Sequence, residues 1–149
     1  MGTEIAQDLI NETHQCAEQR LWRHVLVNAF SETKLPTSDR KSSIYKMQAH
    51  EWIIKDNQDF ETICWWSGWD PETVRNQYLK AIRAGEITFN RKQVMWADYY
   101  KKYLKLKVAN TKEERQNLRA GLEATRLAIF KATTALVSNF IIYQQKLLE

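Results

Sequence analysis

The fold is decided by residues 63–75, which read ICWWSGWDPETVR. Gly68 can adopt the positive φ of a tight turn, a conformation that costs a residue with a Cβ about 1–2 kcal/mol. Asp70 and Pro71 then form a helix start, because a carboxylate accepts hydrogen bonds from unpaired amides and proline is favoured at the first helical position. Cys64 is small enough for two helices to approach closely. The stretch therefore predicts a helix, a sharp turn and a second helix.

These residues resemble the helix-turn-helix superfamily, in which a small residue, a glycine and an aliphatic residue recur at the offsets of Cys64, Gly68 and Val74. The resemblance covers about 20 of the 149 positions. Gln77 departs from the pattern, and we expect Tyr78 to supply the missing apolar anchor one turn after the valine. The resemblance implies that the second helix, residues 71–84, enters the major groove of DNA. The wider pattern of residues 20–83 resembles small helix-turn-helix proteins of phages and prophages.

Charge is distributed unevenly along the chain. Residues 1–70 carry a net charge of −4, residues 71–107 carry +6, and residues 108–149 carry +2. Positive charge therefore begins where the second helix of the motif begins. Clustered cations attract the DNA backbone through its phosphates, and counterion release drives the affinity.

The predicted DNA contacts lie on this second helix and just after it. Arg75 matches the edge of a guanine and Asn76 the edge of an adenine, because each side chain can pair with those bases in two places. The remaining cations are expected on phosphates, which position the protein without reading sequence. The predicted contact residues are Thr73, Arg75, Asn76, Lys80, Arg83, Arg91 and Lys92.

Composition and periodicity predict an ordered, all-α protein. Hydrophobic residues make up 44% of the chain, which contains only four glycines and two prolines, so it lacks the composition of a disordered protein. We expect a helical domain over residues 1–90, with the motif at about 59–84, and a second region over residues 91–149. The expected helices span about residues 3–31, 43–57, 71–84 and 112–148, with one more capped by Asp59 before the glycine turn and another that starts near residue 91.

The last of these helices is long and has three interpretations. A heptad-like seam runs through Leu118, Leu122, Thr125, Ile129, Ala132, Leu136 and Tyr143, which favours a homo-oligomer built through this helix. A second interpretation is packing within the chain along residues 21–30. A third is a membrane span over residues 127–143, which we disfavour because that run is short and diluted by polar residues.

Residues that would indicate catalysis or a cofactor are not grouped in the sequence. There is no glycine-rich phosphate loop and no spacing typical of a nucleophile with its base, so we expect a protein that is not an enzyme and binds neither metal nor cofactor. Cys16 and Cys64 lack metal-ligand spacing to the histidines. Two unpaired cysteines and no signal-peptide pattern suit a cytoplasmic protein.

The leading functional hypothesis is a phage-type transcriptional regulator that binds duplex DNA. A close variant is the small subunit of a phage packaging terminase, in which such a motif recognises viral DNA and helices build a ring. A different hypothesis is a protein-interaction adaptor. Three of the six tryptophans crowd into residues 65–69, and a helix cannot turn all three inward. Trp65 and Trp66 are then candidates for a docking surface that binds a phage or transcription-machinery protein.

Overall fold

The structure, a computed structural model, describes residues 16–138 of the chain. Most of these residues are helical, which confirms the predicted all-α class. The elements in chain order are α2 (Ala17–Glu32), α3 (Arg40–Ile54), α4 (Gln58–Trp66), α5 (Pro71–Arg83), β1 (Phe89–Asn90), α6 (Arg91–Val108), α7 (Lys112–Lys131) and β2 (Leu136–Val137). The first part of the helix expected over residues 3–31 lies outside the described residues.

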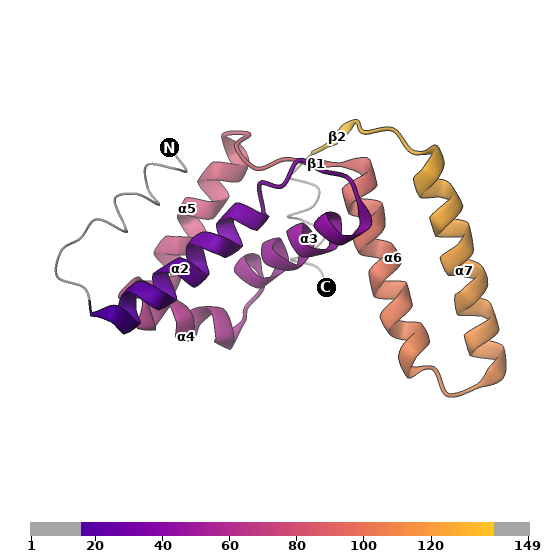
Figure 1. Cartoon of the computed structure of the whole chain (residues 1–149), viewed down its shortest axis with the longest axis horizontal. Helices are drawn as coiled ribbons and strands as arrows, with labels where there is room; N and C mark the ends of the chain where they lie inside the picture. The colour runs from indigo at the N-terminus through magenta and orange to yellow at the C-terminus, as the bar shows by residue number, and fades with distance from the viewer. Residues whose placement is uncertain (1–15, 139–149) are drawn as a thin grey trace.

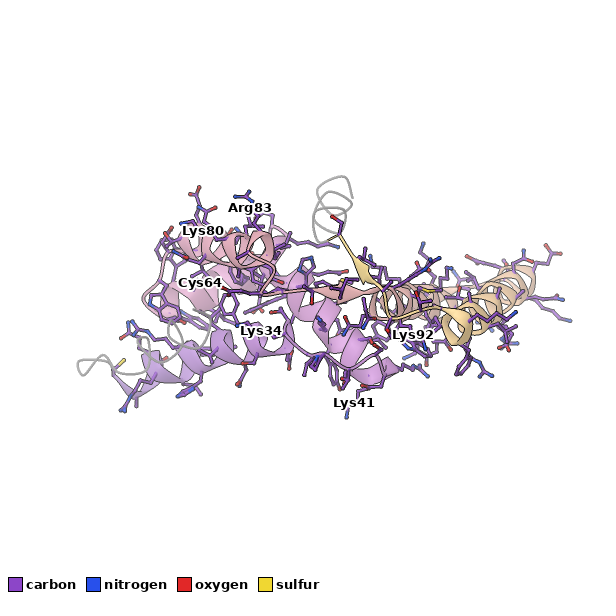
Figure 2. All side chains as sticks on the ribbon, turned by 90° about the horizontal axis from the view of Figure 1, so that it is seen from above. Lys34, Lys41, Cys64, Lys80, Arg83 and Lys92 are labelled. Carbon is purple, nitrogen blue, oxygen red and sulfur yellow. The ribbon has the colours of Figure 1, made fainter. Side chains whose placement is uncertain are left out.

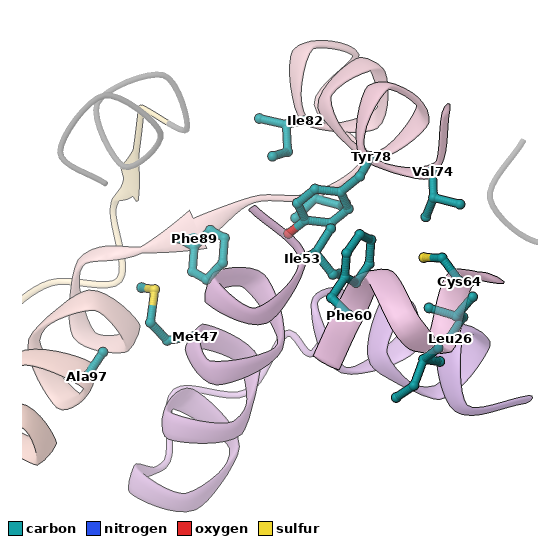
Figure 3. Close-up of a cluster of buried hydrophobic side chains, with 12 residues drawn as sticks. Leu26, Met47, Ile53, Phe60, Cys64, Val74, Tyr78, Ile82, Phe89 and Ala97 are labelled. Carbon is teal, nitrogen blue, oxygen red and sulfur yellow. The ribbon is translucent and has the colours of Figure 1, made fainter. Parts of the chain in front are cut away.

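Helices α2 to α5 pack together into what we call the four-helix body (Figure 1). Its core takes one to three buried side chains from each helix, and Figure 3 shows them converging on one cluster. Burial of each such side chain contributes about 1.5–3 kcal/mol. Those that are at most 1% exposed are Leu26, Ile53, Phe60, Cys64 and Tyr78.

Polar side chains cap the starts of the helices. Asn90 and Gln93 form a capping box at the start of α6, and the Thr111 hydroxyl accepts from the backbone N–H of Glu114 at the start of α7. The start of α3 was predicted three residues too late. The helix begins at Arg40, because the carboxylate of Asp39 accepts a hydrogen bond from the first turn.

Helices α6 and α7 form an antiparallel hairpin that extends away from the four-helix body (Figure 1). Helix α6 packs on α3 at one side and on α7 at the other. The inner face of α7 buries Leu122 and Ile129, and Lys102 of α6 donates a hydrogen bond of 2.9 Å to Thr125 of α7. The predicted seam is therefore occupied within the chain. Its partner is α6, not the helix at residues 21–30, so that part of the packing expectation was wrong.

The predicted helix over residues 112–148 was too long. α7 ends at Lys131, and Ala132 has extended backbone angles of φ −71° and ψ 150°. Leu136, expected in the helical seam, instead lies in β2 and is 70% exposed, and Tyr143 lies outside the described residues. Within residues 16–138, no helix is both long and apolar enough to cross a membrane.

The chain returns after α7 to the start of the hairpin. β2 pairs with β1 in an antiparallel manner, with Phe89 opposite Val137 and Asn90 opposite Leu136. The backbone N–H of Arg91 also donates to the carbonyl of Ala135 at 2.9 Å. Residues 135–137 therefore form backbone hydrogen bonds with β1 and with Arg91. In a longer α7 the same N–H and C=O groups would have bonded within the helix.

A buried lysine joins the hairpin to the four-helix body. Lys46 of α3 is 2% exposed, and its ammonium group donates to the carbonyls of Leu35 and Thr88 and to the Oε1 atom of Gln93. The amide nitrogen of Gln93 donates to the carbonyl of Leu35 at 3.0 Å. Burial lowers the pKa of Lys46 from 10.5 to about 8. These directional bonds fix how the start of α6 sits against α3.

Candidate nucleic-acid interface

The turn between α4 and α5 has the geometry that the sequence predicted. Gly68 has a φ of +80°. Trp69 donates its backbone N–H to the carbonyl of Cys64 at 3.0 Å, which closes the end of α4. Asp70 then caps α5 by accepting from both the backbone N–H and the hydroxyl of Thr73, at 2.9 and 2.8 Å. The direction of α5 is set by these local bonds.

Arg23 of α2 contacts the turn between α4 and α5. Arg23 is 5% exposed, and its Nε atom donates to the carbonyl of Ser67 at 2.8 Å. Its guanidinium also lies 4.6 Å from the centre of the Trp69 ring. Sequence reasoning missed this residue, because nothing local to α2 indicates that an arginine there is buried. The Arg23 contacts tie the turn to the four-helix body.

Buried side chains hold α4 and α5 together. Cys64 is fully buried, and burial raises the pKa of its thiol to about 12, so the thiol stays protonated and unreactive at neutral pH. Val74 packs in the core, and Tyr78 supplies the predicted second anchor of α5. The Tyr78 hydroxyl and the Nδ1 atom of His50 lie 2.7 Å apart. The inward-facing side chains of α5 therefore pack in the core.

The opposite face of α5 is exposed and polar. Thr73, Asn76, Lys80 and Arg83 are all exposed, as predicted. Gln77 is exposed as well and lies beside Asn76, although sequence reasoning passed over it as a departure from the motif. Within residues 16–138, no carboxylate forms an ion pair with Lys80 or Arg83. Both lie in the last turn of α5, where a cation also favours the helix dipole.

Arg75 does not lie on the exposed face, and its assignment as a base-reading residue does not fit the structure. Its Nε atom donates to the carbonyl of Ile53 at 3.0 Å, and its NH2 group donates to the carbonyl of Lys55 at 3.0 Å. The guanidinium stacks 4.9 Å from the Phe60 ring, and its NH1 group lies 3.4 Å from Glu61. Arg75 therefore caps the end of α3 instead of pointing at a ligand.

The positive segment over residues 71–107 does not form one continuous face. Figure 2 shows Lys80 and Arg83 together on one side and Lys92 apart from them, toward the hairpin. Lys92 is partly buried and Arg91 is exposed at the start of α6. Further along α6, Lys102 pairs with Asp98 at 3.0 Å. Only part of the +6 charge is therefore available to a ligand that contacts α5.

Two of the tryptophans are exposed. Trp65 is 62% exposed and Trp66 is 53% exposed, as expected from their crowding in one helix. The Trp66 ring lies 4.7 Å from the ring of Trp22 on α2. Leu21, which precedes Trp22 in α2, is 57% exposed. The Trp22–Trp66 contact therefore leaves apolar surface exposed where α2 and α4 meet.

No protein-family model matches this chain, and the searches of curated proteins and of solved structures also found no match. Within the described range, there is no group of three or more histidine, cysteine, aspartate or glutamate side chains that could hold a metal ion.

Proposed function

We propose that this protein binds duplex DNA without acting as an enzyme, and that it serves as a phage-type transcriptional regulator. The observation that carries the proposal is the outward face of α5. This face follows a rigid glycine turn and presents two adjacent amides and then two cations to solvent. A helix held in this way can enter a major groove, which is wide enough to admit one helix.

The chemistry of this face divides by position. The amides of Asn76 and Gln77 match adenine, because an amide can donate to N7 and accept from the N6 amino group. Lys80 and Arg83, one turn later, are suited to phosphates at the edge of the groove. Glu72, in the first turn, favours the positive end of the helix dipole and adds no attraction for DNA.

A binding assay with a salt titration tests the proposal. A fluorescent library of random duplexes is selected on the full chain, and the enriched duplex is titrated at several salt concentrations. Lys80→Ala and Arg83→Ala should each reduce the slope of log affinity against log salt by about 1. Asn76→Ala should weaken the selected duplex by roughly tenfold while leaving binding to unrelated duplexes unchanged.

Lys105→Ala, at an exposed position of α6, is the matched control and should change the salt slope least. The proposal fails if no duplex is enriched at low salt, or if the control variant weakens binding as much as the two α5 cations. A cytoplasmic setting is part of the proposal and suits the two free cysteines, Cys16 and Cys64.

A second candidate function is an adaptor that docks a phage or transcription protein through Trp65 and Trp66. The specific support is their exposure, since exposed tryptophans are enriched at interaction hot spots. Trp65→Ala removes the more exposed ring and should abolish capture of such a partner while leaving duplex binding intact. Loss of both activities together would instead indicate that the ring supports the fold.

A further inference from the structure

The outward face of α7 carries a regular pattern that the packing of the hairpin does not use. Leu122 and Ile129 point toward α6 and are buried. On the opposite side of the same helix, exposed residues recur at alternating spacings of four and three. We call these residues the outer seam: Glu113, Asn117, Ala120, Ala124, Leu127 and Lys131. This spacing keeps the six residues on one line along a helix.

Small and apolar side chains lie in and beside the outer seam. Leu127 is 52% exposed, and Phe130, which flanks the seam, is 68% exposed. The two alanines at its centre leave room for the backbone of another helix to approach. Figure 1 shows α7 at the outer edge of the molecule, with α6 between it and the four-helix body. Another molecule can therefore reach this face.

The order of charges along the outer seam favours a second copy of this chain, in the antiparallel direction, as the partner. Glu113 lies in the first turn of α7 and Lys131 lies in the last turn. A second copy in the antiparallel direction places each glutamate opposite the lysine of the other chain. The same register places Ala120 opposite Ala124 and Asn117 opposite Leu127. A parallel arrangement would instead place like charges together at both ends, which is destabilising.

We propose that this protein forms an antiparallel homodimer through the outer seam of α7. The contact uses the same surface on both copies, so it closes after two chains. This dimer does not depend on DNA binding, and α5 plays no part in it.

Sedimentation of the full chain over a range of concentrations, without DNA, tests the dimer. The wild-type chain should pass from monomer to dimer as its concentration rises. Leu127→Asp should remain monomeric, since it places a charge in the contact, and its far-UV circular dichroism should match the wild type because the side chain is exposed. Glu113→Lys and Lys131→Glu should each weaken the dimer by roughly tenfold, because both symmetric end pairs become repulsive.

Mixing the two charge variants gives the decisive measurement. In the mixed antiparallel dimer, each end pairs a lysine with a glutamate again, so native mass spectrometry should show the heterodimer in clear excess over either homodimer. Glu86→Lys and Lys105→Glu, which make the same charge changes outside α7, are the controls and should leave dimerisation unchanged. A chain that stays monomeric to about 0.1 mM, a mixture with no preference for the heterodimer, or a ring of many subunits would each overturn the proposal.

Discussion

Replacement of Arg75 by alanine should destabilise the fold and leave DNA recognition intact, which is the reverse of what the sequence alone predicts. The guanidinium donates hydrogen bonds to two carbonyls at the end of α3, stacks on the buried ring of Phe60 and lies near Glu61. All of these contacts disappear in Arg75→Ala. The variant therefore removes a structural cap and no ligand contact.

The expected loss in the free energy of unfolding can be estimated from these contacts. Two charge-assisted hydrogen bonds contribute about 1.5 kcal/mol each, the lower end for a charged group because the side chain is partly exposed, and the stacking on Phe60 contributes about 0.5–1 kcal/mol. The ion pair with Glu61 is partly exposed and contributes at most about 0.5 kcal/mol. Water can reach part of the freed carbonyls, so we expect a net loss of about 2–3 kcal/mol in the free energy of unfolding. For a chain of this size, the melting temperature should fall by roughly 5–10 °C.

Urea denaturation followed by tryptophan fluorescence measures the loss in stability. Duplex affinity is then measured well below the melting temperature, where the variant is folded. Arg75→Lys should recover only part of the stability, because an ammonium group cannot donate to both carbonyls and stack on the ring in the same way. If Arg75→Ala loses less than about 0.5 kcal/mol but binds the selected duplex far more weakly, the structural assignment of Arg75 is refuted and a base contact is supported.

Three further predictions concern the joint, the turn and the cysteines. Lys46 has a pKa of about 8 in the folded chain against 10.5 unfolded, so the folded state disfavours its charge. The free energy of unfolding of the wild type relative to Lys46→Met should therefore rise from pH 8 toward pH 10, as measured by urea denaturation at each pH. Gly68→Ala should lower the free energy of unfolding by about 1–2 kcal/mol, because Gly68 has a positive φ. Gly121→Ala, in a helix with open space around the new Cβ, should raise it by about 0.5–1 kcal/mol. Equal effects of the two variants would contradict the turn assignment. At pH 8 a thiol reagent should modify the exposed Cys16 rapidly and the buried Cys64 only on unfolding, and rapid reaction of both would show that the core opens readily.

The features that were predictable from the sequence depend on residues close together in the chain. Gly68, Asp70 and Pro71 define the turn through backbone conformation and capping, and these effects operate over a few residues. The capping box of Asn90 and Gln93 was recognisable for the same reason. The exposed positions of α5 followed from helical periodicity once Val74 was placed inward.

The features that were missed depend on contacts between distant residues. Periodicity placed Arg75 on the outside of α5, but the carbonyls of Ile53 and Lys55 provide acceptors that only the folded chain brings within reach. The end of α7 was missed because residues after Lys131 pair with β1, far away in sequence. Burial of Lys46 was also unpredictable, since its three acceptors come from the loop before α3 and from the segment around β1, more than ten residues away from it in sequence.

The pairing of β1 with β2 has a consequence for how this protein can vary. Because the strands that flank the hairpin are hydrogen-bonded to each other, the hairpin enters and leaves the fold at one place. Segments whose ends are adjacent are the ones that tolerate insertion, exchange and changes in length. The far ends of α6 and α7, beyond the part of α6 that packs on α3, can therefore be lengthened or shortened together by whole turns while β1, β2 and the four-helix body keep their positions.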